Sequence, residues 1–191
     1  MAVTCFYFDY AARKEQSATS MLGSLLKQMI SGIERIPEEI SWAFQERRNA
    51  IGGSGPQLVD IVKMLQLITS SQRTFMVIDA LDESAEVERF KLFDSLKQIL
   101  KKSPGTRVFV TGRPHIRAEI EQRLAGHVTS VSIIPRKDDI VAYIRARLSQ
   151  DHLPDTMNKT LEAEIVQKIP EKIPEMCVRA TPLRIQPQIN C

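Results

Sequence analysis

Short apolar segments alternate with longer amphipathic segments along this chain, and this alternation constrains the fold more than any other feature. Between the apolar segments, Leu, Ile, Met and Phe recur at the three- and four-residue spacing of an amphipathic helix. Strands that alternate with helices form βαβ units, which build a mostly parallel sheet. The sequence therefore predicts an α/β fold. Strands are expected at residues 4–8, 74–78, 106–110 and 129–134.

The expected strands are nearly continuous in apolar character. Such strands are typical of a parallel sheet that helices cover on both faces, so we expect three layers. In these sheets, ligands bind beyond the carboxyl ends of the strands. That rule points to Asp9, to residues 79–83 and to residues 111–114 as candidate site positions.

Composition and charge exclude several classes of protein. With 43% hydrophobic residues and a net charge of +3, the chain is unlike disordered proteins. No apolar run reaches the ~18 to 20 residues that cross a bilayer, and the first residues lack the basic region of a signal peptide. Cysteines and histidines are scattered without zinc-ligand spacing, and basic residues are dispersed among acidic ones. We expect a soluble, cytoplasmic protein with no membrane or nucleic-acid partner.

The segment FMVIDALDE, residues 75–83, carries the strongest chemical signal. Asp79 lies at the end of an expected apolar strand, and Asp82 and Glu83 follow it within four residues. A carboxylate there can hold Mg²⁺ through water, and a second acid can orient or deprotonate a water that attacks a terminal phosphate. Three carboxylates so close repel one another unless a cation or basic group offsets them. The alternative interpretation is a solvated acidic turn that leads into the next helix.

The segment VFVTGRP, residues 108–114, supplies a basic partner. Arg113 follows the next expected strand, 34 positions after Asp79. That distance is about one βαβ step, so the two strand ends are expected to be neighbours. An arginine there can contact a γ-phosphate or neutralise the acids. The alternative is an ordinary surface arginine, or an ion pair with the acidic turn.

Several segments together resemble one family. They run in order along most of the chain: FYFDY at 6–10, SATSMLGSLLKQM at 17–29, IPEEI at 36–40, FMVIDALDE at 75–83, RVFVTGRPHI at 107–116 and DDIVAYI at 138–144. This set resembles the NACHT domain of STAND-class P-loop NTPases, and most of all the nephrocystin-like N-terminal NACHT module of fungal ankyrin- or WD-repeat proteins. The resemblance implies a partial NTPase core at 1–135 and the start of a small helical domain at 136–169.

The resemblance also implies roles for the candidate residues. Asp79 matches the Walker B acid that associates with Mg²⁺ and the nucleotide. Asp82 and Glu83 match a second acidic pair, with Glu83 as the water-activating group. Arg113 matches a sensor arginine that contacts the nucleotide. The family more often has Ser before that arginine, whereas this sequence has Gly112.

One family element is absent from the 191 residues, which contain no GxxxxGK[ST] phosphate loop. The glycine cluster at 52–55 is not followed by Lys and Ser or Thr, so we reject it. In the family the strand before this loop lies between the strands expected here at 106–110 and 129–134. We therefore expect an incomplete sheet that must close this gap or self-associate. The proline-containing segment 170–191 is expected to be disordered, and the chain is expected to be a truncated module.

Three functional interpretations remain. The first is a partial nucleotide-binding signalling module whose family uses Mg²⁺ with ATP or GTP, but which alone neither binds nor hydrolyses them; its Asp82, Glu83 and Arg113 would be vestigial. The alternative is a non-catalytic interaction module or degenerate pseudo-NTPase that associates with intact relatives. A receiver-like phosphoacceptor domain, with Asp79 as acceptor and Thr111 as switch residue, is disfavoured because Asp9 stands alone and Lys137 is misplaced.

Overall fold

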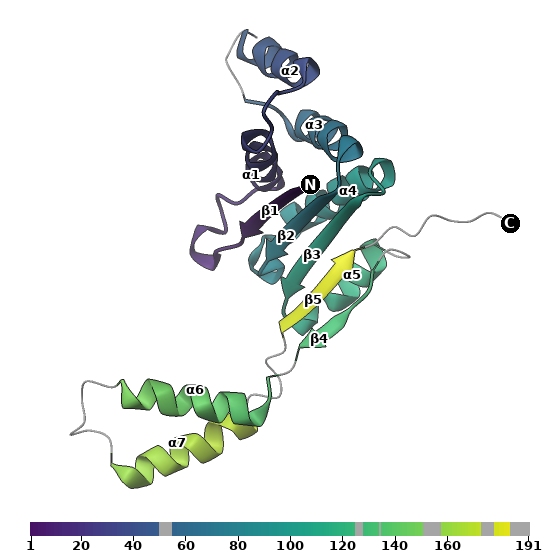
Figure 1. Ribbon diagram of the computed structural model, residues 1–191. Helices are drawn as coiled ribbons and strands as arrows, with labels where there is room; N and C mark the ends of the chain where they lie inside the picture. Colours follow the sequence, from purple (N-terminus) through teal and green to yellow (C-terminus); the bar gives the residue numbers. More distant parts are fainter. Residues whose placement is uncertain (50–54, 125–127, 134, 151–157, 173–177, 184–191) are drawn as a thin grey trace, which may run out of the picture.

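The computed structural model describes residues 1–49, 55–124, 128–133, 135–150, 158–172 and 178–183. These residues form a five-stranded sheet in the order β1-β2-β3-β5-β4 (Figure 1). Three strands are parallel and in register, namely β1 (Ala2–Tyr7), β2 (Thr74–Asp79) and β3 (Thr106–Gly112). The predicted α/β fold with a parallel sheet is therefore confirmed.

The strand beside β3 comes from the end of the described chain. β5 (Val178–Leu183) pairs antiparallel with β3 and with β4 (Val131–Ile133), so β3 and β4 run parallel on either side of it. The disorder expected for residues 170–191 is thus wrong for residues 178–183. The physical reason is that β3 and β4 leave backbone groups to be paired, and unpaired buried backbone groups are costly. The gap expected between these two strands is filled by this backbone.

Helices cover one face of the sheet. α1 (Ala18–Ser31), α3 (Leu58–Ser71) and α4 (Glu86–Lys102) contact one another, and α5 (Arg117–Arg123) contacts α4. Helices α4 and α5 lie behind the strands in Figure 1. The core that these helices form with the sheet includes the following side chains, each at most 1% exposed: Leu22, Leu25, Met76, Ile78, Phe93, Leu96, Val108 and Val110.

The opposite face of the sheet is not covered by any helix in the described part of the chain. Along β2 and β3, buried residues alternate with partly exposed ones, and Phe109 is 37% exposed. The expectation that helices cover both faces is therefore wrong for the described residues. Apolar residues on both sides of a strand predict burial on both sides, and here the second set, which includes Phe75 and Val77, faces outward.

A side chain of α1 closes the free edge of the sheet at β1. The Gln28 amide accepts a hydrogen bond from the Cys5 N–H at 2.9 Å and donates one to the Cys5 carbonyl at 2.8 Å. An edge strand normally exposes these groups to pairing with another chain. Gln28 therefore protects the middle of this edge.

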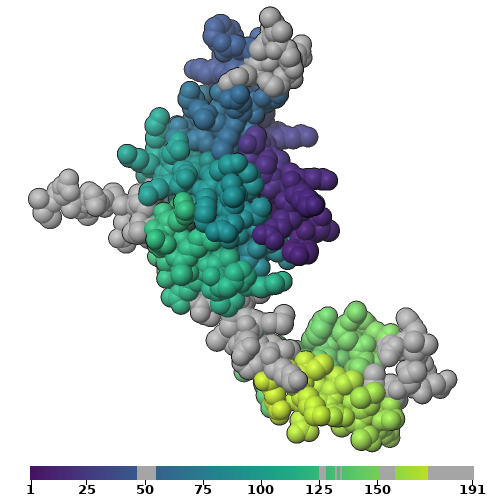
Figure 2. Space-filling model, turned by 180° about the vertical axis from the view of Figure 1, so that it is seen from behind, coloured from purple at the N-terminus to yellow at the C-terminus, as the bar shows by residue number. Residues whose placement is uncertain are grey.

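The remaining helices extend away from the sheet. α2 (Glu38–Asn49) precedes α3, while α6 (Lys137–Ser149) and α7 (Lys159–Lys172) pack against each other. Figure 2 shows the α6–α7 pair apart from the body that contains the sheet. No helix among the described residues is long and apolar enough to cross a membrane.

A carboxylate from α4 holds the start of α1. Ser17 caps α1 by accepting from the Ser20 N–H, and Glu88 accepts from the Ala18 N–H at 2.8 Å. The positive end of a helix dipole favours a carboxylate at this place. The pKa of Glu88 is lowered, first by its hydrogen bond with Lys91 and then by the bond from Ala18. Glu88 therefore links two helices through its charged form.

Glu88→Gln is expected to destabilise the protein at neutral pH by about 1 kcal/mol, because it weakens this charge-assisted contact. A carboxylate with a lowered folded pKa stabilises the fold above its unfolded pKa, and this contribution disappears as the pH falls through the folded pKa. The difference between wild type and variant in urea unfolding should thus shrink below about pH 4. Glu86→Gln, at an exposed position in the same helical turn, is the matched control. A pH-independent difference for Glu88→Gln would contradict this role.

Candidate functional site

The carboxyl ends of the three parallel strands meet at one rim of the sheet. Tyr7 at the end of β1 pairs with Asp79 at the end of β2, and β3 ends beside them at Gly112. The acidic 3-10 turn η2 (Leu81–Glu83) follows β2, and Arg113 follows β3. The in-register pairing thus brings the sequence-predicted residues Asp79, Asp82, Glu83 and Arg113 to one rim.

The hydroxyl of Thr111 holds the turn at the end of β2. It donates to Oδ1 of Asp79 and accepts from the Ala80 N–H at 3.0 Å. Ala80 has φ 54° and ψ 42°, a left-handed conformation that favours glycine. Thr111 therefore fixes both the carboxylate and the strained residue that follows it.

Arg113 pairs with the acidic turn. Its backbone N–H donates to Asp82 Oδ1 at 3.1 Å, and its Nε lies 3.4 Å from Asp82 Oδ2. Its Nη2 lies 4.0 Å from Glu83 Oε1. The Asp82 side chain is only 6% exposed, whereas that of Arg113 is 70% exposed. Of the two functions considered for Arg113, neutralising the acids is the one that these contacts describe.

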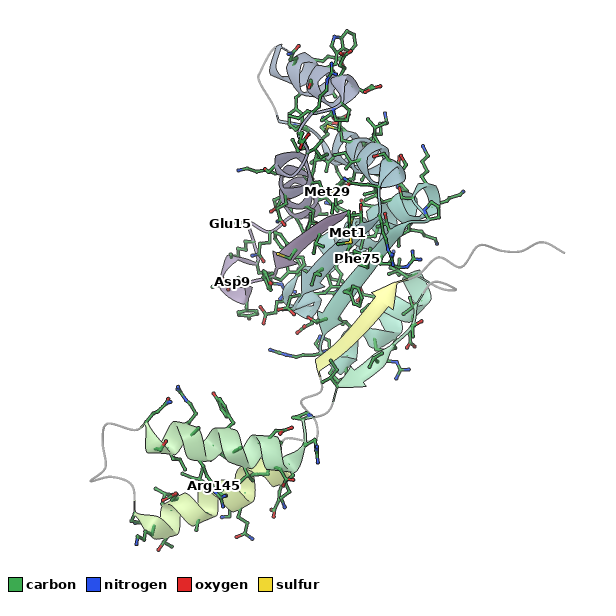
Figure 3. All side chains as sticks on the ribbon, viewed as in Figure 1. Met1, Asp9, Glu15, Met29, Phe75 and Arg145 are labelled. Atoms are coloured by element: carbon green, nitrogen blue, oxygen red, sulfur yellow. The ribbon has the colours of Figure 1, made fainter. Side chains whose placement is uncertain are left out.

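Glu83 also contacts the chain that follows β1. Its Oε2 accepts from the Tyr10 N–H at 2.9 Å. Asp9 does not join the acidic cluster, because its carboxylate caps η1 (Tyr10–Ala12) by accepting from the Ala11 N–H at 2.9 Å. Figure 3 shows Asp9 in this segment beyond the end of β1. Asp9 therefore caps η1 and does not belong to the cluster, although its position after a strand made it a candidate site residue.

A network of two arginines, which sequence reasoning missed, supports the far side of the acidic turn. Arg89 makes a two-point ion pair with Glu119, at 2.8 and 3.0 Å, and donates to the Ser84 carbonyl at 3.0 Å. Arg13 donates to the same carbonyl at 3.1 Å. The available signal was the position of Arg89, which shares a helical face with Leu92 and Phe93, where an apolar residue is expected. A charge at such a position indicates a buried ion pair.

The absence of a side chain at Gly112 permits the close approach of its neighbours. A Cβ atom there would lie 2.6 Å from Ile116 Cδ1 and 3.4 Å from Asp82 Oδ1. Real Cβ atoms do not approach other atoms to 2.6 Å. The serine that the family more often has at this position would thus require Ile116 to move.

The phenol of Tyr7 belongs to the same rim. The neighbouring Cys5 thiol, and more weakly the Asp79 carboxylate, raise the pKa of Tyr7. Tyr7 is 64% exposed. Tyr7 pairs in register with Asp79, and Cys5 lies two residues before Tyr7 on the same strand, so all three lie on the uncovered side of the sheet.

The described residues contain no cluster of three or more His, Cys, Asp or Glu side chains that could hold a metal ion. Asp82 and Glu83 are engaged by Arg113, while Asp79 is engaged by a neutral hydroxyl. Among these three carboxylates, Asp79 is therefore the one that could hold Mg²⁺, through water in the manner this ion prefers.

A family model described as "Nephrocystin 3, N-terminal" matches residues 1–113. The chain belongs to this family. The matched region runs from β1 to Arg113 and so contains all four sequence-predicted site residues. The nephrocystin-like resemblance is confirmed. No curated protein and no solved structure matches the chain significantly.

Thr111→Val is expected to destabilise the protein by about 1–2 kcal/mol, because the Ala80 N–H and Asp79 lose their shared partner while side-chain volume is kept. Thr111→Ser retains the hydroxyl and should preserve most of the stability. Urea unfolding of the two variants makes the comparison. Equal losses in the two variants would mean that the hydroxyl does not hold this turn.

Gly112→Ser is expected to cost about 1–3 kcal/mol through overpacking against Ile116. Ile116→Val removes the Cδ1 atom that clashes, so the double variant should be more stable than the sum of the two single effects predicts. Urea unfolding of the four proteins gives the coupling energy. Additive effects would show that Ile116 does not limit residue 112.

Proposed function

We propose that this chain is a partial NACHT-type signalling module of the STAND class that by itself neither binds nor hydrolyses ATP or GTP. Membership in the nephrocystin 3 N-terminal family supports the type of module. By the resemblance, Asp79 is the Walker B acid, Asp82 and Glu83 are the second acidic pair, and Arg113 is the sensor arginine. Its place of action is proposed to be the cytoplasm.

The internal pairing of the acidic residues carries this proposal. Arg113 lies within ion-pair distance of both Asp82 and Glu83, and Glu83 also accepts from Tyr10. A water-activating acid needs a free lone pair near the attacking water. Here both acids of that pair already serve as acceptors for the chain itself.

The amino-acid sequence also supports the absence of nucleotide binding. The 191 residues contain no GxxxxGK[ST] motif to bind phosphates.

Asp79 is the group that would serve Mg²⁺ if the ion arrived with a triphosphate. The bound ion would neutralise phosphate charge in such a module. Thr111 orients one oxygen of Asp79 and leaves the second oxygen for a metal-bound water. Asp79 therefore has an oxygen that can bind a metal-bound water. Asp82 and Glu83 instead connect η2 to Arg113, the residue that follows β3.

Purified chain is expected to show no change in melting temperature with Mg²⁺ and either ATP or GTP at millimolar concentration, because the acids are engaged and no phosphate loop is present. Differential scanning fluorimetry makes the measurement, with Mg²⁺ alone as the reference. A rise of several degrees that Asp79→Ala abolishes would overturn the proposal. A rise that survives in Asp79→Ala would indicate binding elsewhere.

A second candidate function is a non-catalytic interaction module. The uncovered apolar face of the sheet favours it, because the largest apolar patch on a protein surface, typically a few hundred Å², is often functional. The two candidates are compatible, since a module that has lost nucleotide chemistry can retain a binding surface.

A further inference from the structure

The strands present an apolar surface on the side away from the helices, which we call the open sheet face. We define it by Val3, Phe75, Val77, Phe109, Val131 and Ile133. Register places these residues on one side: Val3 pairs with Phe75, Val77 pairs with Phe109, and Val131 lies level with Thr111 across β5. Val3 is 63% exposed, and Val131 and Ile133 are 48% and 50% exposed.

We infer that the open sheet face docks an amphipathic α-helix of another polypeptide, antiparallel to β1–β3, with the amino end of that helix beside Asp79. Parallel strands normally have helices on both faces, because their side chains are apolar on both sides. In the described part of the chain only one face is covered. The inference concerns a binding surface and does not depend on nucleotide chemistry.

The size of the face favours a helix over a second copy of the chain. Strands of six residues are about 20 Å long, and five strands span about 19 Å, which gives about 400 Å². A stable dimer usually buries about 800 Å² on each partner. A helix of about 13 residues spans 20 Å. A helix therefore matches the face, whereas a dimer through this face alone falls short.

Charges at the two rims set the direction of the helix. Arg73 stacks its guanidinium over Phe75, 5.3 Å from the ring centre, and Arg107 pairs in register with the same residue, so both cations lie at the amino ends of the strands. Asp79 lies at the carboxyl end. The amino end of a helix carries partial positive charge and the carboxyl end partial negative charge. An antiparallel helix thus meets Asp79 with its positive end and the arginines with its negative end.

The charges on the chain's own α6 are not complementary to the two rims of the open sheet face. Its first turn carries Asp138 and Asp139, and its last turn carries Arg147. In the antiparallel orientation, the two aspartates would lie beside Asp79 and the arginine beside Arg107. The complementary partner has the opposite pattern, with basic residues in its first turn and acidic residues in its last.

A designed peptide tests the inference on the full chain. The probe is a fluorescein-labelled helix of about 14 residues with a Leu stripe, two Lys in its first turn and two Glu in its last turn. One control peptide has the same composition with the stripe scrambled, and another has the Lys and Glu positions exchanged. Fluorescence anisotropy should show at least tenfold weaker binding for the scrambled peptide and several-fold weaker binding for the exchanged one.

Variants locate the binding surface. Phe109→Glu and Val3→Lys should each weaken binding of the striped peptide at least tenfold, and circular dichroism checks their folding. Val3 is the more exposed of the two, so its variant keeps the test valid if Phe109→Glu unfolds. Trp42→Glu, on the 73% exposed Trp42 of α2, is the matched control and should bind as wild type does.

Three outcomes would overturn the inference. Equal binding of the striped and scrambled peptides would exclude a helix-specific site. Equal binding of the striped and exchanged peptides would show that the charges at the two rims do not set the direction of the helix. Concentration-dependent dimers in analytical ultracentrifugation that Val3→Lys abolishes would make a second copy of the chain the occupant of the face.

Discussion

The in-register parallel pairing of β2 with β3 is the interaction on which the rest of the molecule depends. Because the two strands run in the same direction, their carboxyl ends lie at one rim, and the residues after each strand meet there. Asp79 reaches Thr111, and Asp82 reaches Arg113, across this pairing. A shift in register by one residue would turn Asp79 and Thr111 to different faces and break the first of these contacts. The helices that cover Met76 and Val108 stabilise the same register from the other side.

The acidic side chains of the site have partners within the same chain. Each acid of the cluster has a partner that comes from a different element: a hydroxyl on β3 for Asp79, an arginine after β3 for Asp82, and a backbone N–H after β1 for Glu83. These contacts connect all three strand ends. These contacts offset the repulsion expected among three close carboxylates, and one of them involves Asp82, whose side chain is only 6% exposed. The same groups that could serve a nucleotide therefore stabilise the rim in its absence.

Much of this rim could be predicted from the sequence, because local signals specified it. The apolar run before Asp79 predicted β2, and the 34-residue step to Arg113 predicted that the two strand ends are neighbours. The antiparallel β5 could not be predicted, because its pairing with β3 depends on contacts between distant segments and its sequence contains Pro182. Phe75 and Val77 led to the expectation that helices of this chain cover both faces of the sheet. Apolar residues indicate that a surface will be buried, but they do not indicate which polypeptide covers it. The apolar positions around Arg89 indicate an ion pair, but its partner could not be predicted because Glu119 lies 30 positions away.

The rim and the open sheet face share Asp79, and this connects the two proposals physically. Asp79 has one oxygen bound by Thr111, so its negative charge is oriented but not neutralised. Asp82 and Glu83, by contrast, have Arg113 beside them. The uncompensated negative charge of the rim therefore lies at the end of the open face, where the amino end of an antiparallel helix would arrive. A helix N-terminus and a hydrated Mg²⁺ both bring positive charge to a carboxylate. Docking of a helix would thus satisfy Asp79 without any nucleotide, so an interaction surface can be retained in a module whose remaining acids already serve its own stability.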